Sequence, residues 1–155
     1  MRKCFDLEKK LKVIHLNTYE GNGGAGRACL RLNDALNANE ANSEVMVYYH
    51  FAESNKTTSF SKTPFQKAFA IFNILAERYL VKLFVKAMKT PFSLQWFGRS
   101  VTKHPKVKQA DSIHVHWINH GSLSPRVLAQ LEDLDKPMVW TFHDSNAFTG
   151  GCHVR

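Results

Sequence analysis

Cysteine is scarce in this 155-residue chain, which has only Cys4, Cys29 and Cys152. The number is odd and no CxxC pair occurs, so we expect a reducing compartment and no disulfide framework. No signal peptide is expected, because the first ten residues are charged and no apolar segment follows. The most apolar stretch, residues 68–88, is interrupted by charged side chains, whereas a membrane span needs about 20 apolar residues. These absences predict a cytoplasmic protein that can still attach peripherally to the inner face of the cytoplasmic membrane.

Acidic residues are also scarce, with 13 Asp and Glu against 21 Lys and Arg and a net charge of +8. The excess is local. Residues 56–108 hold eleven bases and one acid, Glu77, a net charge of +10 that leaves −2 for the rest of the chain. With 44% hydrophobic and 22% charged residues, the composition argues against intrinsic disorder. The length suits one compact domain and is too short for two.

The first part of the chain has the pattern of a βαβ unit. Residues 12–19 are rich in β-branched and aromatic types, which predicts a strand, and residues 44–50 predict a second one. Between them, a glycine cluster, GNGGAGR (Gly21–Arg27), leads into a helix with one apolar face. That face consists of Ala25, Ala28, Cys29, Leu32, Ala35 and Leu36. Such a unit favours a parallel sheet.

The rest of the chain continues with further helices and strands. In order, the pattern predicts a polar loop over 51–65, a long helix over 64–88, an irregular segment over 89–110, a strand over 112–118, a short helix that begins at Ser124–Pro125, and a strand over 137–143. Together these elements predict an α/β fold, with a Rossmann-like, doubly wound sheet of about four parallel strands.

The glycine cluster is the first candidate site. Gly21, Gly23 and Gly26 fit the pattern G-x-G-x-x-G between a strand and a helix, where backbone N–H groups can hold a phosphate. A dinucleotide is disfavoured, because the second strand has no acid near its end before Glu53. Alternatively, the glycines serve only a tight turn and close packing. Arg27 either adds charge beside a phosphate or is merely solvated.

Histidines form the second candidate site. His114 and His116 share one face of a predicted strand, and His120 follows in the next loop. His143 ends the predicted strand over 137–143, and Cys152 and His153 follow closely. No HExxH or CxxC spacing defines a metal site, so we expect no metal, and a packing role is the alternative. Ligands of open parallel sheets bind beyond the carboxyl ends of the strands. This favours a site around His143, Asp144 and Asn119, next to the glycine turn.

The long helix carries a basic stripe, which consists of Arg78, Lys82, Lys86 and Lys89. Apolar side chains occupy much of the remaining circumference. One interpretation places the apolar side in the core and leaves the stripe solvated; another makes the helix an interfacial one on anionic lipid. Nucleic acid is a third option, with Trp96, Phe97 and Arg99 able to stack on bases, but no RNA- or DNA-binding module is present and we predict no nucleic-acid partner.

Three segments together resemble a known family. GGAGR at the first helix, HVHWINHGSLS (His114–Ser124) and KPMVWTFHDSNAFTGGCH (Lys136–His153) are similar to the N-terminal half of family-4 retaining glycosyltransferases, of the bacterial capsule, O-antigen and colanic-acid type. The resemblance covers residues 12–155 and is weak over 51–110. It implies one half of a GT-B fold, in which two Rossmann-like domains face each other and the N-terminal one mainly binds the acceptor.

The resemblance also assigns roles to residues. Gly23, Gly24 and Gly26, with Arg27 beside them, would line the side of the cleft that holds the donor diphosphate. His143 would orient a hydroxyl of the transferred sugar and stabilise positive charge at its anomeric carbon. The acceptor would lie near His116, Asn119 and Asp144. The leaving diphosphate would help to deprotonate the acceptor, and no metal or other cofactor would be required.

The expected function is therefore transfer of a sugar from a nucleotide-sugar donor to a surface polysaccharide or lipid-linked saccharide. The family's donor-binding C-terminal domain, with its E-x7-E signature, has no counterpart here, so the chain is expected to be an incomplete enzyme that transfers no sugar alone. The alternative is a non-catalytic Rossmann-type module that binds a phosphorylated ligand or an anionic membrane surface.

Overall fold

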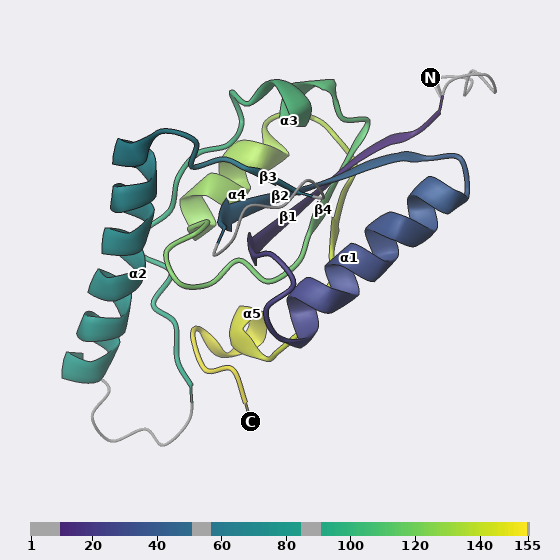
Figure 1. Cartoon of the computed structure of the whole chain (residues 1–155). Helices are drawn as coiled ribbons and strands as arrows, with labels where there is room; N and C mark the ends of the chain where they lie inside the picture. Colours follow the sequence, from purple (N-terminus) through teal and green to yellow (C-terminus); the bar gives the residue numbers. More distant parts are fainter. Residues whose placement is uncertain (1–9, 51–56, 85–90, 155) are drawn as a thin grey trace.

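The chain folds into an α/β domain built on a five-stranded, all-parallel sheet, in a computed structural model that describes residues 10–50, 57–84 and 91–154 (Figure 1). The strand order is β3-β2-β1-β4-β5. The strands are β1 (Lys12–Tyr19), β2 (Asn42–Tyr49), β3 (Thr57–Ser59), β4 (Ser112–Val115) and β5 (Met138–Trp140). The helices are α1 (Gly23–Ala38), α2 (Pro64–Phe84), α3 (Pro105–Gln109), α4 (Pro125–Glu132) and α5 (Asn146–Thr149). The predicted α/β, Rossmann-like fold is confirmed.

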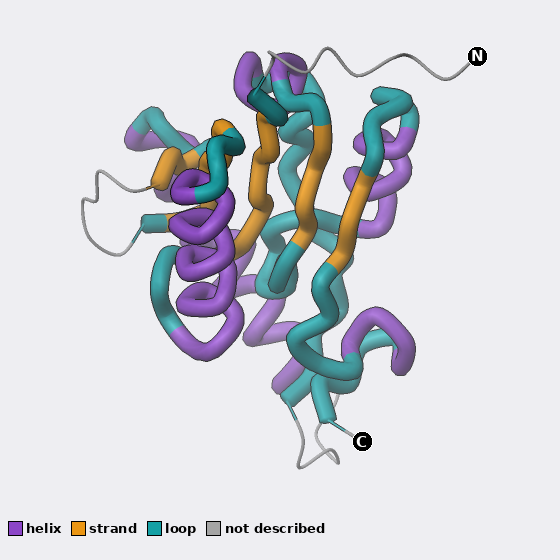
Figure 2. Tube along the Cα trace, turned by 90° about the vertical axis from the view of Figure 1, so that its right-hand side faces the viewer, coloured by secondary structure: helices purple, strands orange, loops and turns teal. Residues whose placement is uncertain are grey.

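Alternate residues of the central strands β1 and β2 face two different layers. Ile14 and Leu16 of β1 face the larger core, which also takes side chains from α2, α3 and α4. The opposite side of the sheet faces α1. There, Cys29 of α1 packs against Val45 and Val47 of β2. Among the strands, α1 packs on β1 and β2. Figure 2 accordingly shows helices on both sides of the sheet.

Some elements differ from the sequence prediction. The sheet has five strands and not four, because β3 forms within the segment predicted as a polar loop. A three-residue edge strand, Thr-Thr-Ser, is held by backbone pairing with β2 and has no apolar period to reveal it. The segment predicted as irregular contains α3, and β4 and β5 end three residues before their predicted ends. The loops that follow β4 and β5 therefore begin earlier and hold His116 and His143.

The orientation of α2 contradicts the interpretation that its apolar side packs into the core. The side chains that α2 buries are Ala70, Asn73 and Glu77. Asn73 Nδ2 donates to the hydroxyl of Tyr48 over 3.0 Å, and burial raises the pKa of Glu77. The apolar side faces out and consists of Phe65, Phe69, Ile71, Phe72, Leu75, Tyr79, Leu83 and Phe84, each at least 40% exposed. The periodicity of apolar residues predicts that a helix has an apolar and a polar face. In α2 the face that contains Asn73 and Glu77 packs on the rest of the domain, and the apolar face is exposed.

Candidate functional site

A pocket of about 320 Å³ opens at the carboxyl ends of β1 and β4, where ligands of parallel sheets bind. It brings the glycine turn and His143 together, although about 120 residues separate them in the sequence. Its lining residues are Asn17, Tyr19, Asn22, Gly23, Gly24, Ala25, Gly26, Trp117 and His143. The pocket thus joins the predicted donor side to the predicted catalytic residue.

The glycine turn positions the first turn of α1 against the pocket. Gly26 must be glycine for packing, since a Cβ there would lie 2.9 Å from the backbone nitrogen of Gly21. Gly23 has a φ of +75°, which a side chain would strain. Gly24 has neither constraint, because a Cβ there would meet no atom within 4 Å. The side chain of Asn22 does not cap α1, so it leaves the first backbone N–H groups of the helix to other acceptors.

His143 lines the pocket and is anchored from below by a second histidine. Its Nε2 lies 3.1 Å from Nδ1 of His116, and the planes of the two rings differ by 23° with their centroids 5.4 Å apart. Burial lowers the pKa of His143, against the opposing effect of Asp144. The imidazole is therefore neutral at physiological pH, with one N–H and one lone pair. A neutral ring can hydrogen-bond a hydroxyl without repelling a developing positive charge.

Asp144 organises the loops around the pocket. Its Oδ2 accepts from Nε1 of Trp117 over 2.7 Å and lies 2.6 Å from Nδ1 of His153. Its Oδ1 accepts from the backbone N–H of Asn146 over 3.0 Å. Asn119 is buried next to this network, with Nδ2 at 3.5 Å from Oδ2 of Asp144. Asn119 and Asp144, two of the predicted acceptor-side residues, therefore form hydrogen bonds with other groups of the protein, and neither lines the 320 Å³ pocket.

His116 lies beneath the site and does not line this pocket. Its side chain is 3% exposed, and both of its ring nitrogens face other histidines, Nε2 toward His15 and Nδ1 toward His143. It does line a smaller cavity, which the loops after β4 and β5 share. Direct contact between this ring and an acceptor, as the resemblance implies, would require those hydrogen bonds to be exchanged.

Four residues of the site and its floor were not predicted from the sequence: His15, Asn17, Tyr19 and Trp117. Asn17 and Tyr19 follow His15 at alternate positions toward the end of β1, so their place at the carboxyl end of a strand was a usable signal. The backbone N–H of Trp117 donates to Oδ1 of Asn17 over 3.0 Å. Burial raises the pKa of Tyr19 to about 12, and its hydroxyl lies 3.0 Å from Nδ1 of His120. Nothing in the sequence placed His15 beside His116, because that contact depends on strand pairing.

Three histidines stand close enough to hold a metal ion. His15, His114 and His116 each offer a ring nitrogen, and these atoms lie within 4.8 Å of one another. They come from the paired strand positions His15 and His114 and from the residue that follows β4. Each of the three also has a hydrogen-bond partner within the protein: Nε2 of His114, for instance, lies 2.8 Å from Oγ1 of Thr141. Both ring nitrogens of His15 and of His116 are thus engaged within the protein, whereas among the described residues a partner is found for Nε2 of His114 and none for its Nδ1. The sequence predicted no metal site here.

The predicted basic residues lie outside the pocket lining. Arg27 is exposed on the first turn of α1, and its Nε donates to the carbonyl oxygen of Gly23 over 3.3 Å. Arg78 and Lys82 are exposed on α2. Lys86 and Lys89 lie outside the described residues. Of the predicted donor-side residues, then, the three glycines share the pocket with His143 and Arg27 lies at its margin.

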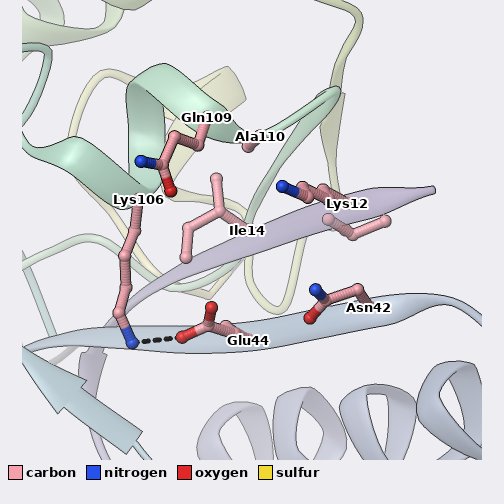
Figure 3. Close-up of a pocket in the computed structure, with 8 residues that line it drawn as sticks. Lys12, Ile14, Asn42, Glu44, Lys106, Gln109 and Ala110 are labelled. Carbon is pink, nitrogen blue, oxygen red and sulfur yellow. Dashed lines mark hydrogen bonds and ion pairs between the residues drawn. The ribbon is translucent and has the colours of Figure 1, made fainter. Parts of the chain in front are cut away.

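A second pocket, of about 90 Å³, lies at the opposite edge of the sheet, at the amino ends of β1 and β2 (Figure 3). Lys106 crosses it to form an ion pair with Glu44 and a 2.8 Å hydrogen bond to Thr58. Both charged side chains are more than one third exposed, so the pair contributes little to stability. Its size and its position at the amino ends of the strands disfavour it as a ligand site.

Comparison of the chain with family models, with curated proteins and with solved structures finds no match in any of the three. The likeness to a glycosyltransferase family consequently rests on three sequence segments alone: GGAGR, His114–Ser124 and Lys136–His153.

Proposed function

We propose that this chain is the acceptor-side domain of a retaining, GT-B type glycosyltransferase. It would take part in sugar transfer from a nucleotide-sugar to a polysaccharide or lipid-linked saccharide at the inner face of the cytoplasmic membrane. The observation that carries the proposal is the single pocket shared by Gly23, Gly24 and His143. In a nucleotide-sugar the diphosphate is bonded directly to the sugar. In this pocket the glycine turn, which suits a diphosphate, and His143, which suits a sugar hydroxyl, line the same space.

The donor diphosphate would lie against the first turn of α1. Backbone N–H groups and the positive end of the helix dipole favour an anion there, and no acidic residue stands in that turn. Gly24, open to solvent and free of packing constraint, lets an oxygen approach the backbone closely. The leaving group of the transfer is a diphosphate, so the same contacts would stabilise its growing negative charge.

His143 would act on the sugar. A neutral imidazole donates to or accepts from a sugar hydroxyl, and it leaves a positive charge at the anomeric carbon unopposed. Trp117 and Tyr19 add aromatic surface to the same pocket, a usual lining for organic ligands. Following the resemblance, the nucleotide and most of the donor-binding groups would belong to a second domain. We therefore expect the 155 residues alone to bind a nucleotide-sugar weakly and to transfer no sugar.

The alternative function, a non-catalytic module for a phosphorylated ligand, uses the same glycine turn. The two proposals differ in affinity. A complete binding module should saturate with nucleotide at micromolar concentration, whereas half of a two-domain site should bind at about millimolar concentration, roughly −4 kcal/mol. Detection of sugar transfer by the isolated chain would contradict our view of it as an incomplete enzyme.

Two glycine variants separate binding from folding at the turn. Gly24→Ala should keep or raise the free energy of unfolding, by up to about 1 kcal/mol, because alanine favours helix and its Cβ meets open space. The same Cβ should weaken binding of a nucleotide-sugar about tenfold or more.

Gly26→Ala should destabilise the fold by about 1–3 kcal/mol, since its Cβ would press on the backbone of Gly21. Urea unfolding and a ligand titration measure both; unchanged binding by Gly24→Ala would count against a diphosphate at this turn.

We further propose that the outward face of α2 rests on an anionic membrane surface. Phe72 and Leu75 are 62% and 58% exposed at its centre, and Arg78 and Lys82 flank them. Apolar side chains with bases at their border are the pattern of a helix that lies in a lipid interface. No helix among residues 10–50, 57–84 and 91–154 is long and apolar enough to cross a bilayer. Such a position would bring the pocket near a lipid-linked acceptor.

Flotation with lipid vesicles tests this docking. The chain should float with vesicles that contain anionic lipid and much less with neutral ones. Replacement of Arg78 and Lys82 by alanine should lower the partition coefficient about 30-fold, because each base near the surface contributes about 1 kcal/mol. The matched control, Arg31→Ala with Lys103→Ala, removes the same charge from exposed positions elsewhere and should have little effect. Equal losses in both double variants would mean that charge alone, and not α2, directs binding.

A further inference from the structure

Four polar side chains form a row across the α1-facing side of the sheet. Oγ of Ser43, in β2, lies 2.9 Å from Nε2 of His15, in β1. Nδ1 of His15 lies 3.0 Å from Nε2 of His116, just after β4. Nδ1 of His116 lies 3.1 Å from Nε2 of His143, which lines the pocket after β5. We call these four residues the histidine row.

Water has little access to the inner part of this row. Ser43 is 6% exposed, His15 is not exposed, and His116 is 3% exposed. Buried ring nitrogens need partners, and in the described part of the chain the only partners found for both rings are their neighbours in the row. The hydrogen bonds of one ring therefore depend directly on those of the next.

A neutral imidazole has one N–H and one lone pair, so a ring inside a row must donate to one neighbour and accept from the other. The direction of donation is consequently the same along the whole row. Either His15, His116 and His143 all carry the proton on Nδ1, or all three carry it on Nε2. A mixed arrangement would place two protons or two lone pairs against each other.

Ser43 distinguishes the two directions. When its hydroxyl donates to Nε2 of His15, every polar group from Ser43 to Nε2 of His143 is paired, and Nδ1–H of His143 remains as the outward donor. In the opposite direction the hydroxyl accepts, and its own proton stays buried without an acceptor among the described residues, which is unfavourable. We propose that Ser43 and His15 are positioning residues, which hold His143 in the Nδ1–H tautomer and so fix it as a hydrogen-bond donor toward the ligand pocket.

This assignment rests on the proposed function only for its ligand. Within that function, Nδ1–H of His143 would donate to an oxygen of the donor sugar, a hydroxyl or a ring oxygen. The row would fix that donor before the ligand arrives, so no tautomer change would be needed on binding. The residues that determine it, His15 on β1 and Ser43 on β2, lie two and three positions away from His143 along the row and do not line the pocket.

Nitrogen-15 NMR of the ligand-free protein tests the row without reference to any activity. Ring nitrogen shifts report the tautomer of each histidine, and scalar couplings between nitrogens report N–H···N hydrogen bonds. We expect Nδ1–H in His15, His116 and His143, with couplings from His15 to His116 and from His116 to His143. His114 is the internal control, because it stacks on His116 at 4.2 Å without a hydrogen bond to it and should show no coupling to its ring. An Nε2–H tautomer in any of these three histidines, or the absence of the couplings, would overturn the proposal.

Substitutions at His15 then test whether the far end of the row controls His143. In His15→Phe the ratio of Nδ1–H to Nε2–H in His143 should fall about fivefold, the factor that corresponds to one net hydrogen bond of about 1 kcal/mol. His15→Asn, whose amide can donate to His116, should restore the ratio, and His114→Phe should leave it unchanged. An unchanged ratio in His15→Phe, or stoichiometric zinc bound in place of the couplings, would overturn the proposal. If His15→Phe does not fold, the couplings and tautomers of the unsubstituted protein decide the matter.

Discussion

Acid should unfold this protein well above the pH at which its carboxylates protonate. Burial lowers the pKa of His15 and of His120 to about 4 and that of His116 to about 3, whereas each titrates near 6.5 in the unfolded chain. Between pH 6.5 and about 4 the unfolded state binds protons that the folded state does not. Stability is therefore full above pH 6.5 and is lost as the pH falls, by as much as about 4 kcal/mol per pH unit for three protons.

Because small domains are stable by only about 5–15 kcal/mol, this slope should bring the midpoint of unfolding to about pH 5. Urea denaturation followed by circular dichroism at pH 7, 6 and 5 measures it. His120→Asn is a suitable variant, since His120 has a φ of +58°, which asparagine tolerates. It should reduce the pH slope by about one third. Equal urea midpoints at pH 7 and pH 5 would show that the folded protein tolerates these charges.

Asp144→Ala should destabilise the protein by about 3 kcal/mol, the second large effect. The carboxylate accepts from Trp117 and Asn146 and contacts His153, so its loss leaves several donors around the pocket without a partner. Hydrogen bonds to charged groups contribute about 1.5–3 kcal/mol each, and their losses do not add fully. The expected fall in melting temperature is about 6–12 °C.

Two comparisons sharpen this prediction. Asp144→Asn keeps an acceptor oxygen and should lose about half as much stability. Asp34→Ala removes an exposed carboxylate from α1 and should stay within about 0.5 kcal/mol of the unsubstituted protein. A loss by Asp144→Ala no larger than that by Asp34→Ala would mean that the loops around the pocket hold together without this carboxylate.

The general place of the site could be predicted from the sequence. A glycine turn after the first strand, and a histidine that ends the last one, must meet at the same edge if the strands are parallel. The pocket that joins Gly23 and Gly24 to His143 agrees with that reasoning. The α/β class followed from local patterns alone, because apolar periodicity distinguishes strands from helices.

What the sequence did not reveal depends on contacts between distant segments. His15 meets His114 and His116 only because β1 pairs with β4 in one particular register, and no local pattern encodes that register. The face that α2 turns inward was equally hidden, since Asn73 and Glu77 become buried through their partners in other elements. His116 and Asp144, which the resemblance places near the acceptor, both form hydrogen bonds to distant parts of the chain that the sequence did not reveal.

Titration of the nitrogen-15 labelled chain with nucleotide-sugars, observed by amide and ring NMR signals, tests the proposed function most directly. UDP- and GDP-sugars, with free UDP and GDP as controls, are raised to several times the expected millimolar dissociation constant. We expect shifts concentrated at Gly23, Gly24, Trp117 and His143, larger for at least one nucleotide-sugar than for its free nucleotide, and weakened in Gly24→Ala. Shifts that are absent from these residues, or that fall around another part of the sheet, would contradict a nucleotide-sugar site at this pocket.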